Sequence, residues 1–235
     1  MTRLTVSTPT EGVLEVELDN GPDNLLTIGM CRELTELLLR PPAGAHVLRL
    51  WANGSAFCLG RERAGTNPEE LRAETKVLAG LQRALRTTPL VTIAEVQGDA
   101  AGFGVGLLAA CDVAVAVADA RFWFPEVGIG LAPALVLAWL PRVVGERQAF
   151  WLTATGEKIP AARALELGLL NGVVGSAEEL RKDVDERVAL LRAGNPRVHA
   201  EIRDMLRAFG AVGDDQALDM SIDRLVVGSL RRGEA

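Results

Sequence analysis

Apolar and polar positions over the first 130 residues predict strands that alternate with helices. Residues 12–18 (GVLEVEL) alternate apolar and polar, as a half-buried strand does. Short apolar runs typical of buried strands follow at 46–51, 90–96 and 112–117. Two amphipathic helices are predicted between them: Thr27 can cap a helix that runs to residue 39, and residues 68–86 place leucines on one side and charges on the other.

Beyond Gly130 the pattern becomes mostly helical. Helices are predicted at 133–143, 146–154, 160–167, 176–192, 196–209 and 214–230, and a strand-like GLLNGVV (168–174) interrupts them. No internal repeat, linker or low-complexity tract is present in the sequence. We therefore predict a single α/β domain over residues 1–235, with a core of strands and helices over about 1–130 and a helical part over about 131–235.

The net charge of the chain limits the classes of partner that it is expected to bind. A formal net charge of −6 argues against nucleic acid or an anionic membrane as the main partner. No run of about 18 apolar residues occurs, and the N-terminus does not resemble a signal peptide. We expect a cytoplasmic protein that binds no nucleic acid and no membrane.

Few residues in this chain suit metal binding or hydrolysis by a serine triad. The three cysteines, Cys31, Cys58 and Cys111, show no CxxC spacing, which supports neither a disulfide framework nor a zinc site. Only two histidines are present, and no GxSxG turn could present a serine nucleophile. We expect no bound metal and no resident cofactor.

Three Gly-containing segments, taken together, resemble the crotonase superfamily, also called the enoyl-CoA hydratase/isomerase family. They are SAFCLGRE (55–62), VQGDAAGFGVGLLAACD (96–112) and ARFWFPEVGIGLAP (120–133). They occur in the family's order and spacing, and the resemblance extends over roughly residues 10–230. It implies a crotonase-like spiral fold of repeated β-β-α units with a helical C-terminal part, and an acyl-CoA thioester as substrate.

In this family two backbone N–H groups stabilise the negative charge that develops on the thioester oxygen. By resemblance these donors are the N–H groups of Arg61 and Phe103, and the helix that begins beside the second loop adds its dipole. Glycines in such loops let the backbone approach a ligand closely. The resemblance further implies that the substrate-binding residues are Ala56, Cys58, Leu59, Gly60, Gly102, Gly104, Gly106, Pro125 and Leu131.

Family members that hydrate enoyl thioesters use two glutamates. Gly106 occupies the position of the first, whereas Glu126 matches the second. Burial beside aromatic residues would raise the pKa of the Glu126 carboxyl, which suits a group that takes and returns a proton. Asp99 is a weaker candidate for the missing carboxylate, and its alternative role is to hydrogen-bond the loop.

The resemblance leaves three functions open. The favoured one is a double-bond isomerase, or a related hydratase or dehydratase, that uses Glu126 as the acid and base. A malonyl-type decarboxylase or a carbon–carbon bond-forming enzyme could use the same oxyanion hole, with the Arg61 side chain holding a carboxylate. The third is an accessory, non-catalytic subunit of a biosynthetic pathway. A homotrimer or homohexamer is also implied, and Arg231 and Arg232 are candidate phosphate contacts.

Overall fold

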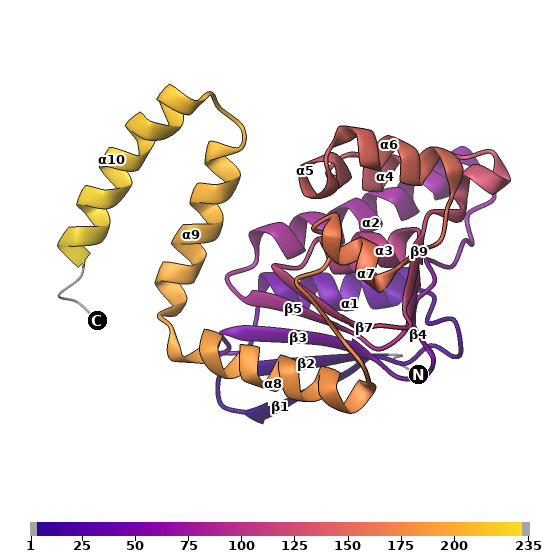
Figure 1. Ribbon diagram of the computed structural model, residues 1–235, viewed down its shortest axis with the longest axis horizontal. Helices are drawn as coiled ribbons and strands as arrows, with labels where there is room; N and C mark the ends of the chain where they lie inside the picture. Colours follow the sequence, from indigo (N-terminus) through magenta and orange to yellow (C-terminus); the bar gives the residue numbers. More distant parts are fainter. Residues whose placement is uncertain (1–3, 232–235) are drawn as a thin grey trace. The chain divides into compact units, whose positions relative to one another are not determined.

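The computed structural model describes residues 4–231, and these form two compact units, the first ending at Ala193 and the second beginning at Gly194 (Figure 1). Arg232, a predicted phosphate contact, lies outside the described residues. The first unit contains two sheets and the helices that cover them. The predicted catalytic residues and the residues predicted to bind the acyl thioester at the two loops belong to this first unit, whereas Arg231 belongs to the second.

The larger sheet has six strands in the order β1-β2-β3-β5-β7-β10. All neighbours run parallel except the first pair, β1 and β2. Residues of β3 and β5 that face either side are buried, which explains why these strands are continuous apolar runs in the sequence. The strands are β1 (Leu4–Thr10), β2 (Val13–Leu18), β3 (Val47–Ala52), β5 (Val91–Val96), β7 (Val113–Val117) and β10 (Gly172–Val174).

A second, smaller sheet is built from the short strands that follow the long ones. Its order is β4-β6-β8-β9, with strands β4 (Ala56–Cys58), β6 (Asp99–Ala101), β8 (Arg121–Trp123) and β9 (Ile159–Pro160). The first turn places β1 and β2 in the larger sheet before its helix, and each of the next three turns adds one strand to the larger sheet, one to the smaller sheet and then a helix. This repeat confirms the predicted spiral of β-β-α units.

The long helices begin at capping residues, one of which, Thr27, the sequence predicts. Thr27 accepts a hydrogen bond from the Met30 N–H at the start of α1 (Ile28–Leu39). Asn67 caps α2 (Pro68–Thr87), whose first turn holds a proline and two glutamates. Figure 1 shows α8 (Ala177–Ala193) along one face of the larger sheet, with α1, α2 and α3 (Phe103–Ala109) on the other.

The predicted helix 133–143 is not continuous. It forms two short helices, α4 (Ala134–Leu137) and α5 (Leu140–Val144), because Pro141 can occupy only the first turn of a helix without losing a hydrogen bond. The remaining helices of the first unit are the 3₁₀ helix η1 (Pro125–Ile129), α6 (Glu146–Thr155) and α7 (Ala161–Glu166). Across residues 4–231 none of the helices has the length and apolar character to cross a membrane.

The second unit is a pair of helices, α9 (Pro196–Phe209) and α10 (Asp214–Leu230). Both were predicted from their spacing of apolar residues. Asn195 caps α9 by accepting a hydrogen bond from the Arg197 N–H. Arg231, the other predicted phosphate contact, lies 3.6 Å from Glu201 in an ion pair within this unit.

Candidate active site

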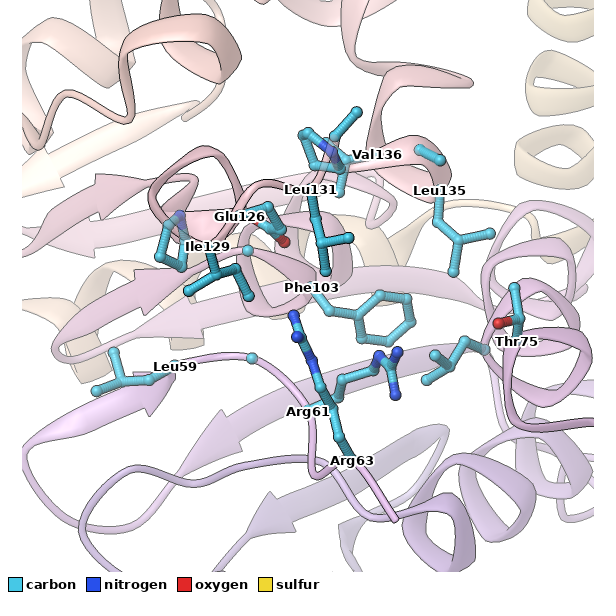
Figure 2. Close-up of a pocket in the computed structure, with 17 residues that line it drawn as sticks. Leu59, Arg61, Arg63, Thr75, Phe103, Glu126, Ile129, Leu131, Leu135 and Val136 are labelled. Carbon is cyan, nitrogen blue, oxygen red and sulfur yellow. The ribbon is translucent and has the colours of Figure 1, made fainter. Parts of the chain in front are cut away.

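The two predicted loops and η1 meet at one cavity of about 290 Å³ in the first unit (Figure 2). One side is formed by the segment after β4, one by the start of α3, and the rest by η1, α2 and the residues that lead into α4. The predicted site residues that line it are Leu59, Gly60, Arg61, Gly102, Phe103, Pro125, Glu126 and Leu131. The lining is mostly apolar, which suits a substrate with a hydrocarbon part.

The first loop presents the backbone N–H of Arg61 to this cavity. Leu26 pairs with the loop as a short parallel bridge: its N–H donates to the Gly60 carbonyl and its carbonyl accepts from the Glu62 N–H, each at 3.0 Å. The amides on both sides of Arg61 are thereby held in place. Within residues 4–231 no group accepts a hydrogen bond from the Arg61 N–H, so this donor is available to a ligand.

The second loop presents the N–H of Phe103, the first residue of α3. Gly102 has φ +50° and ψ −117°, a conformation that a residue with a side chain adopts only with strain. The Gly102 N–H donates to the Trp123 carbonyl at 2.9 Å, which ties the loop to β8. An N–H in the first turn of a helix has no partner within that helix, so the Phe103 donor also faces the cavity free.

The two loops are joined by a close contact at Gly104. A Cβ atom at Gly104 would lie 2.0 Å from the Cys58 carbonyl oxygen, far inside any real contact distance. Only glycine lets α3 approach the end of β4 this closely. The spacing between the two N–H donors therefore depends on Gly104, although Gly104 does not line the cavity.

Glu126 lies directly over the second loop. It occupies the first turn of η1, where Pro125 precedes it. A Cβ atom at Gly102 would lie only 2.6 Å from the Glu126 Oε1 atom, so the carboxyl is packed against the backbone that presents the Phe103 N–H. The other oxygen, Oε2, is buried and has no hydrogen-bond partner among residues 4–231.

Burial sets the acidity of Glu126. Loss of solvent raises the pKa of its carboxyl above the ordinary value. A hydrogen bond from its own backbone N–H and the positive charges of Arg63 and Arg61 act in the opposite direction but do not cancel the effect of burial. A carboxyl whose pKa is raised holds a proton more readily, which suits a group beside two free N–H donors that must accept and return a proton.

Two arginine side chains approach the cavity from the first loop (Figure 2). Arg61 is tied down: its Nη1 lies 3.3 Å from the Glu74 Oε2 atom and 3.4 Å from the Glu62 carbonyl. Glu74, on α2, also accepts a hydrogen bond of 2.6 Å from the Gly65 N–H, so it organises the segment that follows the loop. Arg63 has no hydrogen bond or ion pair within the described part of the chain.

Five predicted site residues do not line the cavity. Ala56 and Cys58 are buried in β4, and the Cys58 thiol donates to the Gly60 carbonyl at 3.2 Å. The Asp99 Oδ1 atom accepts from the Arg121 N–H at 2.8 Å, so this carboxylate joins β6 to β8. Gly104 and Gly106 lie within α3, where they pack against neighbouring elements.

Several cavity residues were not predicted as site residues. Arg63 follows Arg61 by two positions, and this spacing in an extended segment was the only signal for it. Thr75 and Leu78 come from α2, and Ile129, Leu135 and Val136 come from η1 and α4. Their place at the cavity depends on how these helices pack, which the sequence pattern does not reveal. Among residues 4–231 no cluster of three metal-ligating side chains occurs.

The turn before α1 supports the first loop through Asn24. This residue is fully buried and has φ +44°. Its amide nitrogen donates to the Asn53 and Ala56 carbonyls at 2.6 and 2.8 Å, and its Oδ1 atom accepts from the Asn20 N–H at 2.8 Å. The neighbouring Asp23 carbonyl accepts from the Leu59 N–H at 2.9 Å. Asn24 thus fixes the turn that carries Leu26, the partner of the first loop.

We expect Asn24→Ala to lower the free energy of unfolding by about 2–3 kcal/mol, because buried carbonyl groups lose their donors and alanine is strained at this φ. Urea denaturation followed by circular dichroism measures this difference. Asn24→Gly removes the same hydrogen bonds without the strain, so the comparison separates the two causes. An unchanged unfolding midpoint in the alanine variant would contradict this role of Asn24.

Comparison with known proteins finds the same family that the three sequence segments resemble. The family model for enoyl-CoA hydratase/isomerase matches residues 8–222. A Rhodobacter capsulatus protein named "Probable enoyl-CoA hydratase" is 37% identical over 166 residues, which cover 68% of this chain and 64% of that protein. A Thermus thermophilus relative is 35% identical over 212 residues, which cover 85% of this chain and 84% of the relative.

Solved structures agree with the fold. An enoyl-CoA hydratase of Mycobacterium smegmatis superposes with a TM-score of 0.92 at 27% identity, over 99% of this chain and 93% of that one. A Thermobifida fusca protein solved in complex with CoA superposes with a TM-score of 0.88 at 26% identity, over 99% of this chain and 95% of that one.

Proposed function

The chain belongs to the enoyl-CoA hydratase/isomerase family, and on that premise we propose that it is an enzyme that moves the carbon–carbon double bond of an enoyl thioester carried by coenzyme A. The observation that carries this proposal is a single carboxyl group, Glu126, packed beside two free backbone N–H donors in one cavity. A structural neighbour that was solved with CoA supports the choice of carrier.

In the proposed reaction the thioester oxygen lies between the N–H groups of Arg61 and Phe103. Ionised Glu126 takes a proton from C2 of a 3-enoyl thioester, and the C–H bonding electrons move into an enolate whose oxygen the two N–H groups stabilise. Each such donor contributes about 3 kcal/mol to the stability of the developing charge. Glu126 then returns the proton at C4, and the double bond ends between C2 and C3.

The number of carboxyl groups that line the cavity in the described structure favours isomerisation over hydration. Addition of water across the double bond uses a second carboxylate in related enzymes, and Gly106 stands at that position. Glu126 is the one carboxyl-bearing residue among those that line the cavity in the described structure. The Asp99 carboxylate already accepts the Arg121 N–H away from the cavity. One group that accepts and returns the same proton is sufficient for a double-bond shift.

A panel of thioesters tests this proposal directly. Purified protein is incubated in D₂O with a 3-enoyl-CoA, a 2-enoyl-CoA and malonyl-CoA, and the products are identified by mass spectrometry. We expect interconversion of the 2- and 3-enoyl isomers with deuterium incorporation. Loss of CO₂ from malonyl-CoA without isomerisation would instead favour the decarboxylase. Inertness toward every thioester would favour the accessory, non-catalytic role.

The acidic limb of the pH–rate profile reports the pKa of Glu126, which depends on the charges around this carboxyl. Since the base must be ionised, kcat/KM for isomerisation should fall as pH falls through the pKa that burial raises. The positive charge of Arg63 lowers this pKa, so Arg63→Gln removes a stabilising charge and the pKa rises. We therefore expect the acidic limb of the variant to move to higher pH.

The matched control is Arg72→Gln, which removes an exposed arginine of α2 that lies outside the cavity. Its acidic limb should coincide with that of the unmodified protein. A shift of the Arg63→Gln limb to lower pH, or no shift at all, would show that Arg63 does not act on the catalytic base.

A further inference from the structure

Arg63 is an exposed arginine whose side chain lines a mostly apolar cavity. Its side chain lines the same cavity as Glu126 and Phe103, together with leucine, isoleucine, valine and proline side chains (Figure 2). Arg61, the other arginine there, is held by Glu74 and by the Glu62 carbonyl. Within residues 4–231 no acceptor or carboxylate pairs with Arg63. A guanidinium left unpaired in such a place is suited to an anion that arrives with the ligand.

Such an anion could belong to the coenzyme A carrier or to the acyl group. The position of Arg63 distinguishes these two sources. The Arg63 and Glu126 side chains line the same cavity (Figure 2), and the positive charge of Arg63 lowers the pKa of the Glu126 carboxyl. The phosphates of coenzyme A lie beyond the full length of the pantetheine arm, away from the acyl carbon atoms between which Glu126 moves a proton. An anion on the acyl group itself therefore comes within reach of the Arg63 guanidinium when the thioester oxygen lies between the two N–H donors.

We propose that the preferred substrate carries a carboxylate on its acyl group, and that the Arg63 guanidinium binds this carboxylate. The inference rests on the proposed function, because it assumes that the cavity holds an acyl thioester. A plain hydrocarbon chain gains nothing from a cation in the cavity wall, whereas a carboxylate can form two parallel hydrogen bonds with a guanidinium. Arg63 thus selects between acyl groups of similar length by charge.

Binding of two unreactive thioesters tests the inference independently of turnover. Glutaryl-CoA and pentanoyl-CoA have acyl chains of the same length, and only the first ends in a carboxylate. Isothermal titration calorimetry with the unmodified protein should give a dissociation constant about tenfold lower for glutaryl-CoA. In Arg63→Gln we expect this preference to disappear, through weaker binding of glutaryl-CoA and unchanged binding of pentanoyl-CoA.

The controls distinguish the possible causes. Arg72→Gln, on the exposed side of α2, should keep the preference. The same two acyl groups are also titrated as pantetheine thioesters, which have no phosphates, and the preference for glutaryl should persist there. If Arg63→Gln weakens both CoA thioesters equally and neither pantetheine thioester, Arg63 binds a phosphate of the carrier and the inference is wrong.

Failure of the inference is distinguishable from failure of the proposed function. Equal affinity of the unmodified protein for glutaryl- and pentanoyl-CoA overturns the carboxylate preference alone, since a thioester still binds. Absence of binding by either thioester overturns both. A retained preference without isomerisation in the D₂O panel would uphold the carboxylate site and reject the double-bond shift.

Discussion

Replacement of Glu126 by glutamine is expected to lower the rate of double-bond isomerisation by about 10³-fold, because general acid–base catalysis typically contributes about 10²–10⁴-fold. Glutamine keeps the size of the side chain but can neither take nor return the proton. The measurement is kcat for a 3-enoyl-CoA together with deuterium exchange at C2 in D₂O. Both should fall together, because the same carboxyl performs both transfers.

The stability of this variant provides its control. The Oε2 atom of Glu126 is buried without a hydrogen-bond partner in the described structure, and burial raises the pKa of the carboxyl. A carboxyl whose pKa is higher in the folded than in the unfolded state destabilises the fold at any pH where it is ionised. Glu126→Gln should therefore unfold at a temperature equal to or above that of the unmodified protein. A loss of activity that accompanies a lower unfolding temperature would point to misfolding instead of lost proton transfer.

A second glutamate supplies a matched comparison. Glu69 is exposed on the first turn of α2 and does not line the cavity. Glu69→Gln should leave kcat within about twofold, since surface substitutions away from special features change little. Unchanged isomerisation by Glu126→Gln would remove this residue from the mechanism.

Gly104→Ala is expected to damage both stability and catalysis. The new methyl group would meet the Cys58 carbonyl oxygen at 2.0 Å and the Cys58 carbonyl carbon at 2.8 Å, so α3 must move away from β4. Overpacking of this kind costs about 1–3 kcal/mol of folding free energy. The displacement also separates the Arg61 and Phe103 N–H groups, and loss of one oxyanion donor lowers kcat by about 10²–10³-fold.

Gly80→Ala makes the same chemical change where space is available. Gly80 lies inside α2, and a Cβ atom there would have no neighbour within 4 Å. This variant should be more stable than the unmodified protein by about 0.5–1 kcal/mol, because alanine favours a helix interior over glycine. Equal activity and stability of Gly104→Ala and the unmodified protein would show that the contact between the two loops is not needed.

The apolar pattern of the sequence predicted most of the long elements, because the helices bury one face and the central strands are buried along their whole length. The helices α1, α2 and α8 and the strands β3, β5 and β7 fall within a few residues of the predicted ranges. The edge strand β1 was missed: only its first residue is buried, so it shows no apolar alternation. The two- and three-residue strands of the smaller sheet are too short to carry a period.

The candidate site was predicted in part, and for different reasons at different residues. Glu126, Arg61 and Phe103 were placed by resemblance of three segments, and all three line one cavity. Arg63 was not predicted, since its role depends on the distance between the first loop and η1 in space. The contact between Gly102 and Glu126 likewise joins segments that the sequence keeps apart. Local pattern contains no information on such approaches.

The bridge between Leu26 and Arg61 also bears on how the protein acquires its activity. Three groups of the site come from segments far apart along the chain: the Arg61 N–H that this bridge positions, the Phe103 N–H and the Glu126 carboxyl. Parallel pairings between distant segments form slowly, because long loops must close before the contacts stabilise them. During refolding from denaturant, far-ultraviolet circular dichroism is thus expected to recover before turnover does. The oxyanion hole is therefore expected to be among the last features of the fold to form.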